Sequence, residues 1–82
     1  MTIKIFNLSQ DITDSALEKL FRPYGIVDTA LVDRNVLNGR SKGNGIVEMP
    51  IENQAMQAIA SLDRTIVDGK RISVQEWKQP TS

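Results

Sequence analysis

The chain has no cysteine and no histidine among its 82 residues. Without cysteine there is no disulfide framework, thiolate zinc site or thiol nucleophile, and without histidine the commonest general base and metal ligand is missing. The acidic residues are scattered, and no segment has the alternating aspartate and asparagine spacing of a calcium-binding loop. We therefore expect a protein that is not an enzyme and that carries no metal and no cofactor.

The chain also lacks a net charge, because lysine plus arginine and aspartate plus glutamate number 10 each. A neutral protein does not attract RNA from a distance, so any attraction for nucleic acid must come from local groups of cations. No segment approaches the roughly 18 consecutive apolar residues of a membrane span, and the alternating first residues do not resemble a signal peptide. We expect a soluble globular domain that is cytoplasmic and has no membrane partner.

Hydrophobic spacing predicts strands and helices that alternate along the chain. Thr13 is placed to cap a helix that ends near Pro23 and Gly25, and Pro50 opens a second helical segment. Polar and apolar residues that alternate predict strands over residues 2–6 and 70–77. Residues 26–33 are rich in apolar and β-branched residues, and residues 43–49 form the next extended run, so both segments are predicted to be strands.

Strand, helix, strand, strand, helix, strand is the order of a ferredoxin-like βαββαβ fold of the α+β class. We expect residues 1–78 to form a four-stranded antiparallel sheet with two helices on one face, followed by a polar C-terminal tail at residues 79–82. Because side chains alternate between the faces of a strand, the sequence assigns the covered face to Ile3, Ile5, Val47, Met49, Ile72 and Val74. It assigns the open face to Lys4, Phe6, Leu31, Asp33, Asn44, Ile46, Glu48, Arg71, Ser73, Gln75 and Trp77.

The chain resembles the RNA recognition motif (RRM) family from Thr2 to about Trp77, because several short segments match the signatures of the family in the same order. Residues 3–8 correspond to the hexamer signature of the family and residues 42–49 to its octamer signature, with further matches at residues 20–25, 39–43, 55–62 and 68–74. The short length resembles that of single-domain bacterial members. The resemblance implies the ferredoxin-like fold, with single-stranded RNA as the partner on the open face of the sheet.

Three positions depart from these signatures. The second hexamer position and the third and fifth octamer positions usually carry aromatic residues on which bases stack, and here they are Lys4, Asn44 and Ile46. Stacking on an aromatic side chain contributes about 1–3 kcal/mol per base. We therefore expect RNA binding that is weak and of low sequence specificity.

Cations, amides and rings on or beside the open face are the residues expected to contact RNA. Lys4, Arg40 and Lys42 are suited to phosphates, whereas the amides of Asn44 and Gln75 are suited to base edges. The full set is Lys4, Phe6, Arg40, Lys42, Asn44, Ile46, Arg71, Gln75, Trp77 and Lys78. The competing interpretation is ordinary solvation of surface side chains.

Two groups on or beside the open face have their own alternatives. Trp77 either stacks on a base or packs against Lys4 in a cation–π contact that covers the sheet. Lys70, Arg71 and Lys78 either contact the RNA backbone or protect an edge strand from pairing with another strand.

A protein-interaction domain on the same scaffold is the alternative function. Leu31, Ile46, Phe6 and Trp77 would then form the centre of a surface for another protein or for self-association. A further variant would use the helix side, because residues 64–66 loosely resemble the Arg-x-Phe loop of related peptide-binding domains, with Ile66 in place of the aromatic residue.

Overall fold

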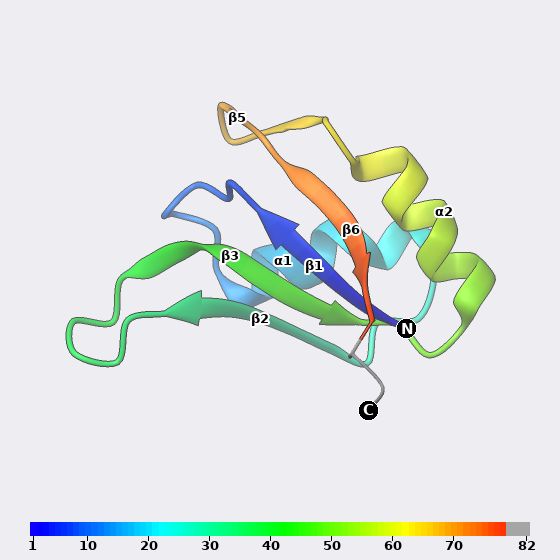
Figure 1. Ribbon diagram of the computed structural model, residues 1–82, viewed down its shortest axis with the longest axis horizontal. Helices are drawn as coiled ribbons and strands as arrows, with labels where there is room; N and C mark the ends of the chain where they lie inside the picture. Colours follow the sequence, from blue (N-terminus) through cyan, green and yellow to red (C-terminus); the bar gives the residue numbers. More distant parts are fainter. Residues whose placement is uncertain (79–82) are drawn as a thin grey trace.

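The structure, a computed structural model, describes residues 1–78, and the tail predicted for residues 79–82 lies outside the described residues. The described part forms a sheet with helices on one side (Figure 1). Its elements are β1 (Thr2–Phe6), α1 (Asp14–Phe21), the 3-10 turn η1 (Arg22–Tyr24), β2 (Thr29–Arg34), β3 (Ser41–Glu48), α2 (Glu52–Leu62), β4 (Ile66–Val67), β5 (Lys70–Arg71) and β6 (Ser73–Trp77).

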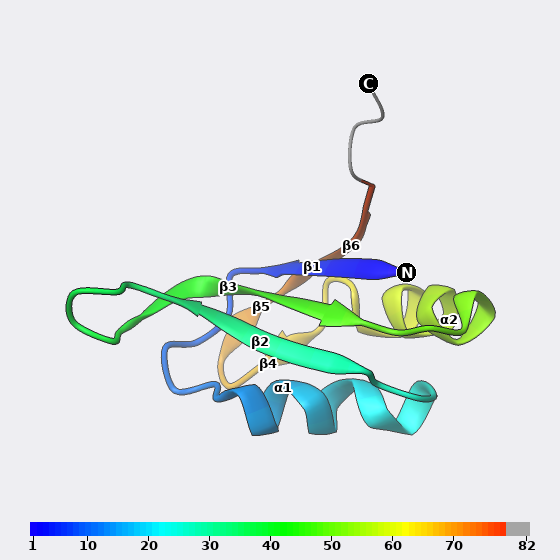
Figure 2. The ribbon, with the colours of Figure 1, turned by 90° about the horizontal axis from the view of Figure 1, so that it is seen from below.

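The main sheet has the antiparallel strand order β2-β3-β1-β6, which confirms the predicted ferredoxin-like fold of the α+β class. In Figure 1, α1 lies behind β1 and β3, and α2 lies beside β6. The turned view places α1 along one side of the sheet (Figure 2). The opposite face of the sheet carries no helix within residues 1–78.

The hydrophobic core lies between the sheet and the helices. All six side chains predicted for the covered face, Ile3, Ile5, Val47, Met49, Ile72 and Val74, are buried. From the helices, Leu17 and Phe21 of α1 and Ala55, Ala58 and Leu62 of α2 join them in one cluster. The period-two assignment of the covered face is therefore confirmed, and the face opposite is fixed by the same alternation.

The first helix begins where the sequence predicts. The Thr13 hydroxyl accepts a hydrogen bond from the backbone nitrogen of Ala16 at 3.1 Å, which satisfies a free donor of the first turn. The carboxylate of Asp14 accepts a hydrogen bond from the backbone nitrogen of Val32 at 2.7 Å. This bond ties the start of α1 to β2 and so fixes the helix against the sheet.

The last predicted strand, residues 70–77, is wrong as a single element. Asp68 and Gly69 adopt positive φ angles of 50° and 80°, and they connect β4 to β5 in a separate two-stranded hairpin. The backbone of Ile72 pairs with Thr65 and Arg64 instead of β1, so the main sheet gains its fourth strand only at Ser73. Arg71, predicted for the open face of that strand, therefore belongs to the hairpin.

The second strand starts later than predicted, at Thr29 instead of residue 26. The backbone nitrogen of Ile26 donates to the Gln54 side chain at 3.0 Å, so this part of the chain is held against α2 and not in the sheet. α2 itself begins at Glu52, after Pro50 and Ile51.

Candidate nucleic-acid interface

One end of the open face is occupied by a contact between a cation and a ring. Trp77 pairs with Thr2 at the end of β6, and the ammonium of Lys4 lies 5.1 Å from the centre of the Trp77 ring. The cation–π alternative for Trp77 is therefore confirmed. Trp77 is still 40% exposed, so part of it is accessible to a ligand.

The middle of the open face is apolar. Ile46 of β3 lies between Lys4 of β1 and Leu31 of β2, its partners in the strand register. Leu31 is 51% exposed and Ile46 is half-buried. These aliphatic side chains offer apolar contact area without an aromatic ring.

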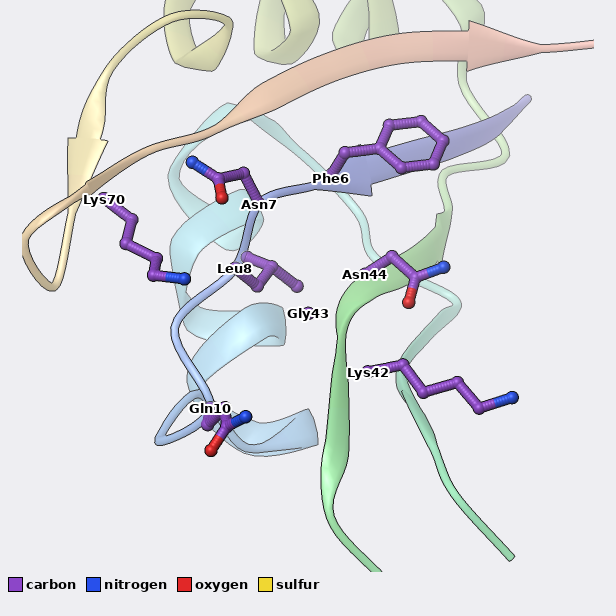
Figure 3. A pocket seen from close by; sticks show the side chains of 8 residues that line it. All are labelled: Phe6, Asn7, Leu8, Gln10, Lys42, Gly43, Asn44 and Lys70. Atoms are coloured by element: carbon purple, nitrogen blue, oxygen red, sulfur yellow. The ribbon is translucent and has the colours of Figure 1, made fainter.

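The other end of the open face contains a hollow of about 550 Å³ between β1, β3 and β5. In Figure 3, Lys70 reaches toward it from β5, while Lys42 stands on β3 at the opposite side. We call it the lysine hollow, and its lining residues are Phe6, Asn7, Leu8, Gln10, Lys42, Gly43, Asn44 and Lys70. Two cations with no acidic side chain in the lining favour an anionic group such as a phosphate.

Local backbone geometry shapes the lysine hollow. Gly43 has a positive φ of 82°, and its carbonyl accepts a hydrogen bond from the backbone nitrogen of Leu8 at 2.8 Å. Asn7, with φ of 64°, donates from its side-chain nitrogen to the carbonyl of Arg71 at 2.8 Å. The end of β1 is thus tied to β3 on one side and to the β4–β5 hairpin on the other.

Tight packing fixes β3 beside this hollow. A Cβ atom at Gly45 would lie 2.9 Å from Cδ2 of Leu17 and 3.2 Å from Cδ1 of Leu8. The glycine therefore allows β3 to approach α1 closely.

A second hollow, of about 290 Å³, lies over β2 and β3. We call it the β2 hollow, and its lining residues are Lys4, Leu31, Val32, Asp33, Asn44, Gly45 and Ile46. Asn44 lines both hollows. Its Oδ1 atom is buried and has no hydrogen-bond partner within residues 1–78.

Further cations lie in the loop between β2 and β3 and at the end of β2 that leads into it. Nη1 of Arg34 donates to the carbonyl of Gly39 at 3.2 Å, and the backbone nitrogen of Arg40 donates to Oδ1 of Asn38 at 2.9 Å. Figure 1 shows this loop projecting away from the helices at one end of the molecule. Arg40 is exposed there and lines neither hollow.

The structure brings together only part of the residue set expected to contact RNA. Phe6, Lys42 and Asn44 share the lysine hollow, while Lys4, Asn44 and Ile46 share the β2 hollow. The remaining members are Arg40 in the β2–β3 loop, Arg71 in the hairpin, Gln75 opposite Lys4, Trp77 against Lys4, and Lys78, whose Nζ lies 4.0 Å from Oε2 of Glu76.

The expected set omits two residues that line the lysine hollow. Lys70 is placed there by the β4–β5 hairpin, and Gln10 by the loop that follows β1. Asp68-Gly69 is the sequence signal for that hairpin, because this dipeptide favours a two-residue turn with positive φ angles. Gln10 has no comparable signal, since its position depends on how the loop folds.

Within residues 1–78, no three or more acidic side chains lie close enough together to hold a metal ion. None of the helices in the same range has both the length and the apolar character needed to cross a membrane.

Comparison with known proteins matches residues 3–73 to the model of the RNA recognition motif. The 28 kDa chloroplastic ribonucleoprotein of Spinacia oleracea is 39% identical over 72 residues, which are 88% of this chain and 31% of that protein. This chain therefore spans about a third of that relative's length. The expectation of a bacterial-type member stays a prediction.

Solved structures share the fold closely. A crystal structure of RNA binding protein PG1 superimposes with a TM-score of 0.93 at 34% identity, covering 100% of this chain and 99% of that one. The protein in an SXL-lethal protein/RNA complex gives a TM-score of 0.89 at 31% identity, covering 99% of this chain and 48% of that one.

Proposed function

This chain belongs to the RNA recognition motif family, and we propose that its open sheet face binds single-stranded RNA weakly and with little sequence preference. The observation that carries the proposal is the pair of hollows that meet at Asn44 on the face without helices. One is bordered by lysines and the other by aliphatic side chains, which are the two kinds of contact that a nucleotide needs. The likeness to a protein solved in complex with RNA supports RNA as the ligand.

Each part of the face has a role in this proposal. Lys42 and Lys70 contact a phosphate in the lysine hollow, with Phe6 as its apolar wall. Ile46 contacts a base, and Asn44 hydrogen-bonds to a base edge. Cations beyond the two hollows add backbone contacts that read no sequence, and these are Arg40, Arg71 and Lys78.

Weak binding follows from what occupies the stacking positions. Lys4, Asn44 and Ile46 offer no ring, and each lost stack removes about 1–3 kcal/mol. Trp77 is the remaining ring at the edge of the face, next to Gln75, but Lys4 already lies over it. A base that stacks there must displace this contact, which is worth about 0.5–1 kcal/mol at an exposed site.

Binding, and not catalysis, is the activity that we propose. The described face presents cations, amides and aliphatic groups, but none of the pairs of nucleophile and base that covalent catalysis requires. A complex with RNA needs no cofactor, because all of the contacts above come from side chains of the sheet and its loops.

An NMR titration of the ¹⁵N-labelled chain with short mixed-sequence RNA tests the proposal. We expect amide shifts at Lys4, Phe6, Asn44 and Ile46, and a steep loss of affinity as salt is raised, because phosphate contacts release counterions. Amides of the four main strands that do not shift at millimolar RNA in low salt would refute it.

Self-association through the open face is the second candidate function. The exposed side chains of Leu31 and Trp77 stand on either side of half-buried Ile46, and exposed apolar groups on one face favour an interface. This version predicts a sedimentation coefficient that rises with concentration and a Trp77→Ala variant that stays monomeric. A wild-type chain that is monomeric at all concentrations would contradict it. The version that uses residues 64–66 on the helix side to bind a peptide stays a prediction. Ile66, which stands in place of the aromatic residue there, is exposed and belongs to the β4–β5 hairpin.

A further inference from the structure

The β2 hollow has the surface chemistry of a base site and not of a phosphate site. Leu31 and Ile46, which face each other directly in the register of β2 and β3, form an apolar wall. Asp33 lines the same hollow, and its negative charge repels a phosphate. A flat and uncharged group that brings hydrogen-bond donors is the ligand that this combination accepts.

Asp33 is exposed, and alternation along β2 places it on the open face with Leu31, on either side of buried Val32. The register between β2 and β3 shifts beside Asp33: the two steps from Val32 to Arg34 lie opposite four steps of β3, from Gly45 to Ser41, so the extra residues of this bulge lie in β3. The cation that also lines the hollow, Lys4, is held over the Trp77 ring. The Asp33 carboxylate therefore has no salt bridge within residues 1–78 and is available to accept hydrogen bonds from a ligand.

Asn44 supplies the complementary donor. Its Oδ1 is buried and has no hydrogen-bond partner among the described residues 1–78, which leaves the amide nitrogen as the polar atom that a ligand can reach. In Figure 3 this nitrogen points away from Gly43 and the lysine hollow. The β2 hollow thus presents a carboxylate acceptor from one strand and an amide donor from the next.

We propose that the β2 hollow binds one guanine base of a single-stranded RNA, an inference that rests on the proposed RNA-binding function. The N1–H and N2–H₂ groups of guanine are adjacent donors that a carboxylate can accept together, and the neighbouring O6 accepts from the Asn44 amide. Adenine and cytosine offer the carboxylate one amino group beside a ring acceptor. Uracil offers one donor between two acceptors, which the carboxylate repels. The β2 hollow would therefore prefer guanine at one nucleotide of the RNA, whereas the rest of the open face would bind RNA of any sequence.

Titration of the chain with the RNA pentamers UUGUU, UUAUU, UUCUU and UUUUU tests this assignment. We expect UUGUU to bind about fivefold more tightly than UUUUU or better, as a good bidentate contact to a base discriminates. Amide shifts at Asp33 and Asn44 should be largest with UUGUU. Equal affinities for all four RNAs would overturn the guanine site and leave RNA binding in place, whereas no binding by any of them would overturn both proposals.

The variant Asp33→Asn isolates the carboxylate. It should reduce the ratio of UUGUU to UUUUU affinity to about one, because a neutral amide no longer accepts both guanine donors. Asp28→Asn is the matched control, since it makes the same charge change at an exposed aspartate just before β2 and outside both hollows. A ratio that is unchanged in Asp33→Asn, or lost equally in Asp28→Asn, would overturn the role of Asp33.

A guanine base also occurs in free nucleotides, and 5′-GMP distinguishes the two sources. We expect GMP to bind much more weakly than UUGUU, because it lacks the contacts of a strand along the sheet. Affinity for GMP equal to that for UUGUU would overturn the assignment to RNA.

Discussion

The ammonium of Lys4 lies 5.1 Å from the centre of the Trp77 ring and so joins the middle of β1 to the end of β6 across the open face. Lys4 stands at a position where the family signature expects a ring, and Trp77 supplies one from the neighbouring strand. The contact brings a positive charge and an aromatic surface together at one edge of the face.

Replacing Lys4 by methionine should separate these two properties. Lys4→Met keeps a long side chain beside Trp77 but removes the charge, and we expect a loss of about 0.5–1 kcal/mol in the free energy of unfolding. The emission of Trp77 should shift, because the cation no longer lies over the ring. Lys19→Met, on the exposed side of α1, is the control, and equal effects of the two variants on Trp77 emission would contradict the contact.

Restoring an aromatic residue in β3 should strengthen RNA binding. Ile46→Phe places a ring at the fifth octamer position, in the middle of the face, and we expect affinity for mixed-sequence RNA to rise about fivefold or more. Fluorescence anisotropy with labelled RNA measures the change. Leu37→Phe adds the same ring to the exposed β2–β3 loop and serves as the control. An Ile46→Phe variant that binds no better than wild type would argue against base contacts at this position.

A methyl group at Gly45 should destabilise the fold. Gly45→Ala places a Cβ atom 2.9 Å from Leu17 Cδ2 and 3.0 Å from the carbonyl oxygen of Leu31, and overpacking of this kind costs about 1–3 kcal/mol. Urea denaturation measures the loss. Gly39→Asn is a suitable comparison, because no atom of residues 1–78 lies within 4 Å of a Cβ there and asparagine tolerates the φ of 72°. Equal stability of the two variants would show that β3 has room to move from α1.

Loss of the N-terminal cap of α1 should lower the free energy of unfolding without changing the structure of the open face. Thr13→Ala removes the hydroxyl that accepts from Ala16, and we expect a loss of about 1 kcal/mol in the free energy of unfolding. Thr13→Ser keeps the acceptor and should recover most of this stability. RNA affinity of the folded Thr13→Ala protein should equal that of wild type, and a large fall in affinity would show that the helix start influences the sheet face.

The covered face of the sheet could be predicted because one physical constraint dominates it. Alternation in β1 places Ile3 and Ile5 on the same side, and that side must be buried against the helices. The cap at Thr13 could be predicted equally well, because it depends only on residues that are close in the sequence.

The β4–β5 hairpin could not be read from periodicity, because each of its strands has only two residues. Its presence moves Arg71 out of the main sheet and turns Lys70 toward the lysine hollow. The two interpretations of Trp77 also could not be separated from the sequence. They differ in the direction of the Lys4 side chain, which the packing of four strands decides.

The exposed loop between β2 and β3 has a practical consequence. Val36 and Leu37 are 97% and 93% exposed, and the backbone bonds that shape the turn, from Gly39 to Asn35 and from Asn35 to Arg40, begin and end within it. Because these two side chains do not pack in the hydrophobic core, the loop is a suitable place to insert an affinity peptide, to attach a dye or to create new chain ends by circular permutation. Such engineered forms should fold as the parent does while leaving both hollows free for a ligand.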